Sequence, residues 1–205
     1  MTFRIAAIAL LAVLASCATK LPPPLPLFVE VEPYVPPTPG VAQIVFLSPA
    51  ATPTPANANA LYNLDGGHRT LIAALAGHTG SFQRVTPGHH VFMTFGRGAH
   101  LLEANVEEGC RYYVLLRVDG NDDLVPLPMR MTADAEITNR SPESGQWIVD
   151  STMVEKTPAA DVFFARKSQV DAAQADALAA WQRKTPQARA ALTLEPADAE
   201  LRILR

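Results

Sequence analysis

Short apolar runs separated by turn-forming residues dominate the chain between residues 41 and 131. Asp-Gly, Pro-Gly and other glycine-containing steps end these runs, as expected for strands joined by tight turns. Many short strands at regular spacing are typical of sandwiches and barrels. We therefore expect a mainly β fold, an antiparallel β-sandwich of about seven strands. The predicted strands are 41–47, 60–64, 69–75, 81–85, 89–95, 100–106 and 111–118, with 124–131 and 146–154 as additional candidates.

One pair of runs is specific enough to predict a register. If Gly96-Arg97-Gly98 forms a three-residue hairpin loop, Phe92 lies opposite Leu102 and His90 lies opposite Ala104. The apolar members of this pair then face the core, and His90 points inward with them. Arg97, presented at the hairpin tip, is a candidate interaction residue.

In the last third of the chain, the spacing of apolar residues changes from the pattern of strands to that of helices. Apolar residues from Val170 to Trp181 recur at helical spacing behind Ser168, a plausible N-cap. Thr185-Pro186 predicts a second, shorter helix. We therefore expect one or two C-terminal α-helices within residues 156–205. The apolar stripe either docks on the sheet, pairs with a helix of a partner, or stays free, and Trp181 is a candidate interaction residue.

The first seventeen residues combine Arg4, an apolar run over residues 5–14, and Leu14-Ala15-Ser16-Cys17. The run is too short to span a bilayer, and it suits the apolar region of a secretory signal. The pattern resembles a bacterial lipoprotein signal peptide, residues 1–16. That resemblance implies acylation of Cys17, for example with palmitate, and Ala18 implies sorting to the outer membrane. The alternative is an ordinary secretory signal cut near Ala15-Ser16.

Residues 17–40 follow as a Pro-rich tether. Eight of the eighteen prolines of the chain lie here, and proline excludes helices and central strands. A polyproline spacer of this length reaches roughly 70 Å. Two alternatives are an edge strand docked on the folded body, and a Pro-rich segment recognised by a partner. The body would then comprise a sandwich over residues 41–155 and a helical extension over 156–205.

Composition narrows the function classes. A chain that is 48% hydrophobic and 18% charged can bury a substantial core. A net charge of −3 provides no basic surface for nucleic acid. With Cys17 assigned to lipid, Cys110 has no intramolecular partner; it is either buried or paired with another molecule.

Two short motifs resemble a known family. They are Pro87-Gly88-His89-His90 and Gly109-Cys110-Arg111-Tyr112-Tyr113-Val114. Behind a lipoprotein signal, they resemble the domain-of-unknown-function family 2846 of bacterial lipoproteins. The chain departs from that family at His89 and Cys110, where lysine is usual. The resemblance implies a small β-sandwich over residues 41–118 and no assigned activity.

Candidate chemistry is sparse. His89 and His90 point to opposite faces of a strand, and the predicted register separates His90 from His100 by about 13 Å. Residues 119–123 begin like a calcium loop, but Leu124 and Arg130 stand where glycine and glutamate are required. The Gly-x-Ser-x-Gly pattern of many hydrolases does not occur. We therefore predict no metal, no cofactor and no catalytic residue, with a hydrolase built from dispersed residues as the remote alternative.

These observations predict a lipid-anchored cell-envelope protein, held at the periplasmic face of the outer membrane. Its body is expected to be a non-enzymatic structural or protein-interaction module with an envelope protein as partner. The alternative is a carbohydrate- or peptidoglycan-binding module. Such a site would need exposed aromatic side chains, for which the candidates are Tyr34, Tyr62, Tyr113 and Trp147.

Overall fold

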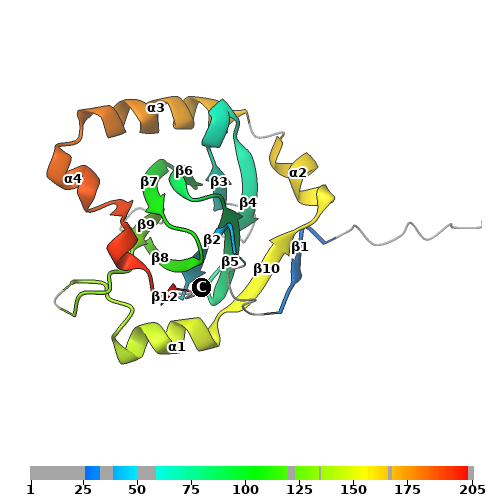
Figure 1. Cartoon of the computed structure of the whole chain (residues 1–205). Helices are drawn as coiled ribbons and strands as arrows, with labels where there is room; N and C mark the ends of the chain where they lie inside the picture. Colours follow the sequence, from blue (N-terminus) through cyan, green and yellow to red (C-terminus); the bar gives the residue numbers. More distant parts are fainter. Residues whose placement is uncertain are drawn as a thin grey trace, which may run out of the picture.

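The protein is built in four layers (Figure 1). The computed structural model describes residues 26–32, 39–49, 59–119, 123–133, 135–165 and 168–202. Helices α2 (Pro158–Ala165) and α3 (Gln169–Arg183) cover a five-stranded sheet, which packs on a seven-stranded sheet. Helix α1 (Pro142–Asp150) covers the far side of the second sheet.

The five-stranded sheet is built around the β6–β7 hairpin. Its strand order is β11 (Thr193–Leu194), β7 (Ala99–Val106), β6 (Gly88–Phe95), β3 (Ala60–Asn63) and β4 (Thr70–Ala74). The hairpin has the predicted register, with Phe92 opposite Leu102 and His90 opposite Ala104.

The seven-stranded sheet is centred on β2. Its order is β1 (Phe28–Glu30), β10 (Thr152–Lys156), β5 (Thr79–Val85), β2 (Ala42–Ser48), β8 (Cys110–Val118) and β12 (Leu201–Arg202). The seventh strand, β9 (Leu124–Pro128), pairs with the second half of β8, while β12 pairs with its beginning.

A mainly β protein with C-terminal helices is confirmed, but the finer prediction needs correction. Within the described residues there are twelve strands, not about seven, and four α-helices. Both sheets are mixed and not antiparallel, because β2–β8, β10–β5 and β11–β7 are parallel pairs. Parallel neighbours need crossover connections. Between β2 and β8, the chain builds β5 and most of the other sheet.

The predicted strand over residues 146–154 is wrong for residues 146–150, which belong to helix α1, whereas residues 152–154 lie in β10. Ser141 caps α1, with its hydroxyl accepting a hydrogen bond from the Ser144 amide at 3.2 Å, and Pro142 occupies the first turn. Because proline is favoured in that position and serine is a strong N-cap, the segment starts as a helix. Strand β10 begins only at Thr152.

The inner core lies between the two sheets. Every second residue of β2, β7 and β8 points into it, which is the alternation expected of strands. Its members include Ile44, Phe46, Phe92, Leu102, Ala104, Tyr112 and Val114. Cys110 belongs to this core as a buried free thiol, as predicted.

Helix α3 docks on the outer face of the five-stranded sheet. Trp181 is 3% exposed and packs in a second apolar cluster with α2 and the sheet residues Tyr62, Met93 and Leu101. Trp147 and Ile148 of α1 pack against a third cluster on the outer face of the other sheet. Both faces of β2 are therefore covered, and all seven of its residues are buried.

The C-terminal segment closes both sheets. Helix α4 (Pro186–Ala190) begins at the predicted cap, where the Thr185 hydroxyl accepts from the Ala188 amide at 3.2 Å. Strand β11 then joins one sheet and β12 the other. Between them lies a 3-10 turn at Pro196–Asp198. Arg130 ties this segment down through Asp198 at 2.5 Å and the Thr193 carbonyl at 2.8 Å. The described residues of 156–202 thus contribute strands to both sheets as well as helices.

Part of the predicted tether belongs to the body. Strand β1 pairs antiparallel with β10, and the Thr157 hydroxyl donates to the Pro26 carbonyl at 2.7 Å. For residues 26–32, the docked-strand alternative describes the structure. Residues 17–25 and 33–38 lie outside the described residues.

Candidate functional site

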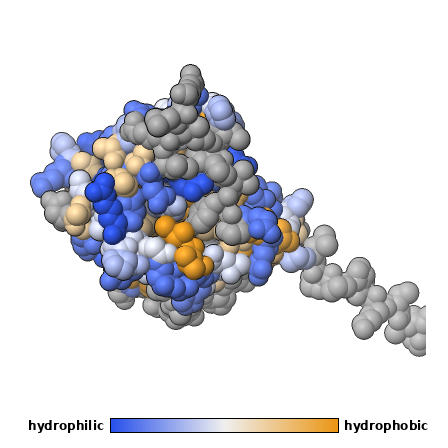
Figure 2. Space-filling view, turned by 60° about the horizontal axis from the view of Figure 1, so that its bottom comes forward, coloured by the Kyte–Doolittle hydropathy of each residue, from blue (hydrophilic) through white to orange (hydrophobic). Residues whose placement is uncertain are grey.

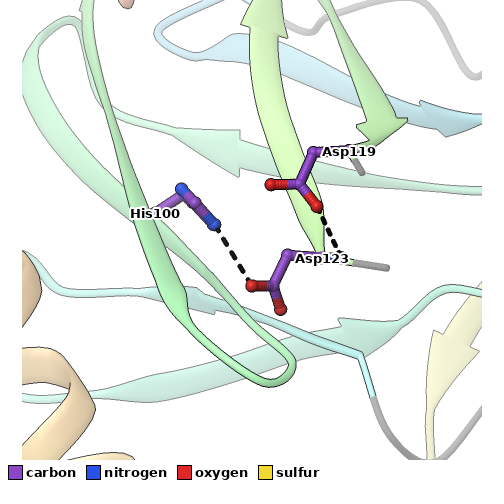
Figure 3. Close-up of side chains that lie close together, drawn as sticks. All are labelled: His100, Asp119 and Asp123. Carbon is purple, nitrogen blue, oxygen red and sulfur yellow. Dashed lines mark hydrogen bonds and ion pairs between the residues drawn. The ribbon is translucent and has the colours of Figure 1, made fainter. Parts of the chain in front are cut away.

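Polar residues from both sheets meet at one open end of the inner core. His100 lies at the start of β7, on the face that carries Leu102 and Ala104 into the core. Asp119 follows β8 and Asp123 precedes β9, and the Asp123 side chain contacts the loop of the β6–β7 hairpin. Figure 3 shows the three side chains converging between their strands.

Asp123 holds the hairpin loop. One carboxylate oxygen, Oδ1, accepts hydrogen bonds from the amides of Arg97 at 2.7 Å and Gly98 at 2.9 Å. The other oxygen, Oδ2, lies 3.1 Å from the Gly98 amide and 3.7 Å from His100 Nε2. Asp123 is only 7% exposed. Its carboxylate therefore needs these donors, because a buried charge without partners is strongly unfavourable.

Asp119 and His100 complete a compact group of donors. Asp119 Oδ1 accepts from the Asp123 amide at 3.0 Å, which closes the turn between β8 and β9. One ligand-type atom from each of His100, Asp119 and Asp123 lies within 4.8 Å of the others. His100 Nε2 is buried and makes no hydrogen bond within the described part of the chain.

Asn59 lies beside this group as a buried, unpartnered amide. The residue is 2% exposed, and in the described structure neither its Oδ1 nor its Nδ2 has a hydrogen-bond partner. A Cβ built on Gly96 would lie 2.5 Å from Asn59 Oδ1 and 2.9 Å from Asp123 Oδ1. The Asn59 amide and the Asp123 carboxylate therefore both approach Gly96. A larger residue at position 96 would collide with them.

The arrangement has two chemical interpretations. As a clamp, Asp123 accepts hydrogen bonds from the hairpin-loop amides, lies beside His100, and so holds the hairpin loop against the start of β9. As a ligand set, an imidazole nitrogen and two carboxylates are donors that divalent metal ions bind. Sequence reasoning considered the histidines and the acidic loop separately, and it therefore missed their juxtaposition. The one signal available was that His100 is an inward-facing polar residue at a strand end.

A second histidine–aspartate pair lies at the other end of the hairpin. His90 Nδ1 contacts Asp65 Oδ2 at 2.5 Å, and Nε2 contacts the Thr86 carbonyl at 2.7 Å. This confirms the prediction that His90 points inward, and its ring is also bonded to the backbone. Burial acts to raise the pKa of Asp65, but hydrogen bonds from His90, the Val91 amide and Asn63 together hold that pKa below its usual value. Because a carbonyl occupies Nε2, the pair is a structural clamp and not a base facing a nucleophile.

The residues predicted as sites are dispersed. Cys17 lies outside the described residues. Arg97 is exposed at the hairpin tip, as predicted, and its amide contacts Asp123. Trp181 is buried beneath α3, so its side chain is not presented to a partner.

The aromatic residues considered for sugar binding are mostly inside the fold. Tyr62 and Tyr113 are buried, and burial raises the pKa of Tyr62 to about 12 despite the nearby Arg69. Trp147 is half-buried beside a surface hollow of about 370 Å³ that Arg117 and Glu136 also line. Tyr34 lies outside the described residues.

Comparisons with known proteins found no matching family model, no matching curated protein and no matching solved structure. No helix in the described ranges is both long and apolar enough to cross a bilayer.

Proposed function

We propose that the protein is a lipid-anchored component of the bacterial cell envelope, with a folded body that acts as a non-enzymatic interaction module. The observation that carries this proposal is Leu14-Ala15-Ser16-Cys17 behind Arg4 and the apolar run. Cys17 is the acylated residue in this proposal. In the lipoprotein sorting pattern of enteric bacteria, a residue other than aspartate after the acylated cysteine implies the outer membrane. Ala18 therefore favours the periplasmic face of the outer membrane.

The docking of β1 supports a short distance between anchor and body. The Pro26 carbonyl is the first hydrogen-bonded group along the described chain, through Thr157. Eight residues separate Cys17 from Pro26, and even a fully extended chain over these nine steps spans only about 30 Å. The body is therefore expected close to the bilayer, with the edge formed by β1 and β10 nearest the anchor.

The mostly hydrophilic surface supports a body that is exposed to water. Hydrophobic residues form small separated patches on the face of Figure 2, which is mostly hydrophilic. Among the described residues, the exposed large hydrophobic side chains are spread over β1, α1, α2 and α3: Val29, Val149, Val162, Phe163 and Leu178. Extended apolar patches mark large hydrophobic interfaces, so this distribution favours a smaller or more polar contact.

A carbohydrate- or peptidoglycan-binding module is the second candidate, and Trp147 favours it. Its ring lies beside a hollow with a cationic and an anionic side chain, Arg117 and Glu136. Sugar sites combine an aromatic face with polar groups of this kind. Retention of the detergent-solubilised protein on purified sacculi would favour this candidate over a protein-interaction module.

The anchor is tested by metabolic labelling with palmitate. Wild-type protein should incorporate the label and sediment with membranes, whereas Cys17→Ala should incorporate none and appear in the soluble fraction. Cys110→Ala is the matched control, because Cys110 is a buried thiol of the core, and it should label like the wild type. Absence of label from the wild type, or an unmodified full-length amino terminus by mass spectrometry, would refute the proposal.

A further inference from the structure

We propose that His100, Asp119 and Asp123 bind a divalent transition-metal ion of the Zn²⁺ class at the open end of the sandwich. This goes beyond the anchored interaction module proposed above, and it does not depend on it. The imidazole comes from the start of β7, and the two carboxylates come from just after β8 and just before β9. The three side chains converge on one another (Figure 3).

The donor types favour this class of ion. Imidazole nitrogen and carboxylate oxygen suit Zn²⁺, Mn²⁺ and related ions, whereas Ca²⁺ takes six to eight oxygen ligands. Two carboxylates and a neutral imidazole carry a formal charge that one divalent ion balances. The imidazole donor and the small number of oxygen ligands disfavour Ca²⁺.

The geometry needs only small adjustments. Around a tetrahedral ion with bonds of about 2.1 Å, donor atoms are about 3.4 Å apart. The three donors already lie within 4.8 Å of one another, and His100 Nε2 is 3.7 Å from Asp123 Oδ2. Rotation of the His100 and Asp119 side chains can close the remaining gaps, because both residues are only partly buried. The backbone amides that hold Asp123 leave it fixed as the central ligand.

Asn59 is the independent observation that points to a ligand. Buried polar side chains almost always have a hydrogen-bond partner, yet both polar atoms of Asn59 have none in the described structure. Asn59 Oδ1 and Asp123 Oδ1 lie 2.5 Å and 2.9 Å from the same point, the position that a Cβ on Gly96 would take. Three protein donors leave a fourth position for water on a tetrahedral ion. Asn59 is placed to bond that water, or to occupy the position itself.

Calorimetry tests the proposal. The detergent-solubilised full chain is first stripped of metal with a chelator and is then titrated with Zn²⁺, Mn²⁺ or Ca²⁺. We expect one Zn²⁺ per chain. His100→Gln and Asp119→Asn should each weaken binding at least tenfold. Asp119→Asn keeps the oxygen that accepts the Asp123 amide, so the turn should be preserved. Thermal unfolding in chelator should confirm that each variant folds.

His89→Gln is the matched control. His89 lies on the same hairpin and pairs with a carboxylate, Glu103, at 3.6 Å, but its side chain is half exposed. Within the described residues, this pair has no third metal-ligating side chain near it. It should bind Zn²⁺ like the wild type. With Co²⁺ as a probe, the wild type should show tetrahedral visible absorption that His100→Gln loses.

Three results would overturn the proposal. The first is no saturable Zn²⁺ binding by the wild type, which leaves His100 and Asp123 as an ion pair only. The second is an equal loss of affinity in His89→Gln and His100→Gln, which indicates adventitious surface histidines. The third is a preference for Ca²⁺ over Zn²⁺.

Discussion

Two histidine–aspartate pairs lie at opposite ends of the β6–β7 hairpin and differ in their environment. His90 has both ring nitrogens bonded, to Asp65 and to the Thr86 carbonyl. His100 has one buried nitrogen without a hydrogen bond in the described chain, beside two carboxylates. A histidine with both ring nitrogens hydrogen-bonded fits a structural role, whereas a buried ring nitrogen without a hydrogen bond fits a metal-binding role.

Asp65→Asn should lower the free energy of unfolding by about 1 kcal/mol at pH 7, because charge-assisted bonds to His90 are lost and the site is partly exposed. The folded pKa of Asp65 is lowered, so its stabilisation is present above the unfolded value near 3.9 and is lost as the pH falls through the folded value. The stabilities of wild type and variant, measured by urea unfolding, should therefore converge at acid pH, below the folded pKa of Asp65.

The control for this prediction is Asp171→Asn. Asp171 pairs with Arg69 at 2.6 Å but is 77% exposed, and exposed pairs contribute little. The variant should match the wild type at both pH values. A difference between Asp65→Asn and wild type that persists unchanged at low pH would contradict the assignment to the carboxylate.

At the scale of elements, the runs with the strongest periodicity or the clearest turn residues were predicted well. The β6–β7 hairpin has the predicted register because Gly96 and Gly98 define its loop. Helix α3 follows its apolar spacing, and Thr185-Pro186 starts α4. Helix α1 was missed because Gly145 and Ser144 suggest a loop, although the cap of Ser141 and Pro142 outweighs them.

Trp181→Ala tests the docking of α3. Truncating a buried aromatic residue that contacts the sheet should lower the free energy of unfolding by about 3 kcal/mol or more. Leu178→Ala on the same helix removes a side chain that is 40% exposed, and it should lower stability by less than about 1 kcal/mol. Urea unfolding of the full chain measures both. Equal effects of the two variants would contradict a docked helix.

At the scale of the whole molecule, the C-terminal segment is part of the sandwich and not an appendage. Strands β11 and β12 pair with β7 and β8 in different sheets. Arg130, just beyond β9, joins this segment through Asp198, Thr193 and Ala190. The last third of the chain therefore holds the two sheets in place at one edge.

Arg130→Gln should lower the free energy of unfolding by about 2–4 kcal/mol, because it leaves the buried Asp198 without its cation. The exposed pair Arg117–Glu136 provides the control, and Arg117→Gln should have an effect below about 1 kcal/mol. Hydrogen exchange at the Glu103 amide, which donates to the Leu192 carbonyl at 3.2 Å, should accelerate only in Arg130→Gln. Unchanged protection there would contradict the role given to Arg130.

The sequence by itself determined the local features of this protein. Apolar alternation, glycine turns and helix caps depend on neighbours a few residues apart, so most strands, the hairpin register, α3 and the buried Cys110 were predictable. The continuous apolar runs of β2 and β8 also indicate burial on both faces.

Only the tertiary structure decided which distant segments meet. The parallel pairs, the docking of β1 and the closure by β11 and β12 join residues far apart in sequence, where local propensity carries no information. The same holds for the candidate metal site, because Asp123 meets His100 and approaches Asn59 only when the two sheets pack. Local patterns constrain dihedral angles and faces, whereas the choice among pairings depends on the burial of the whole core.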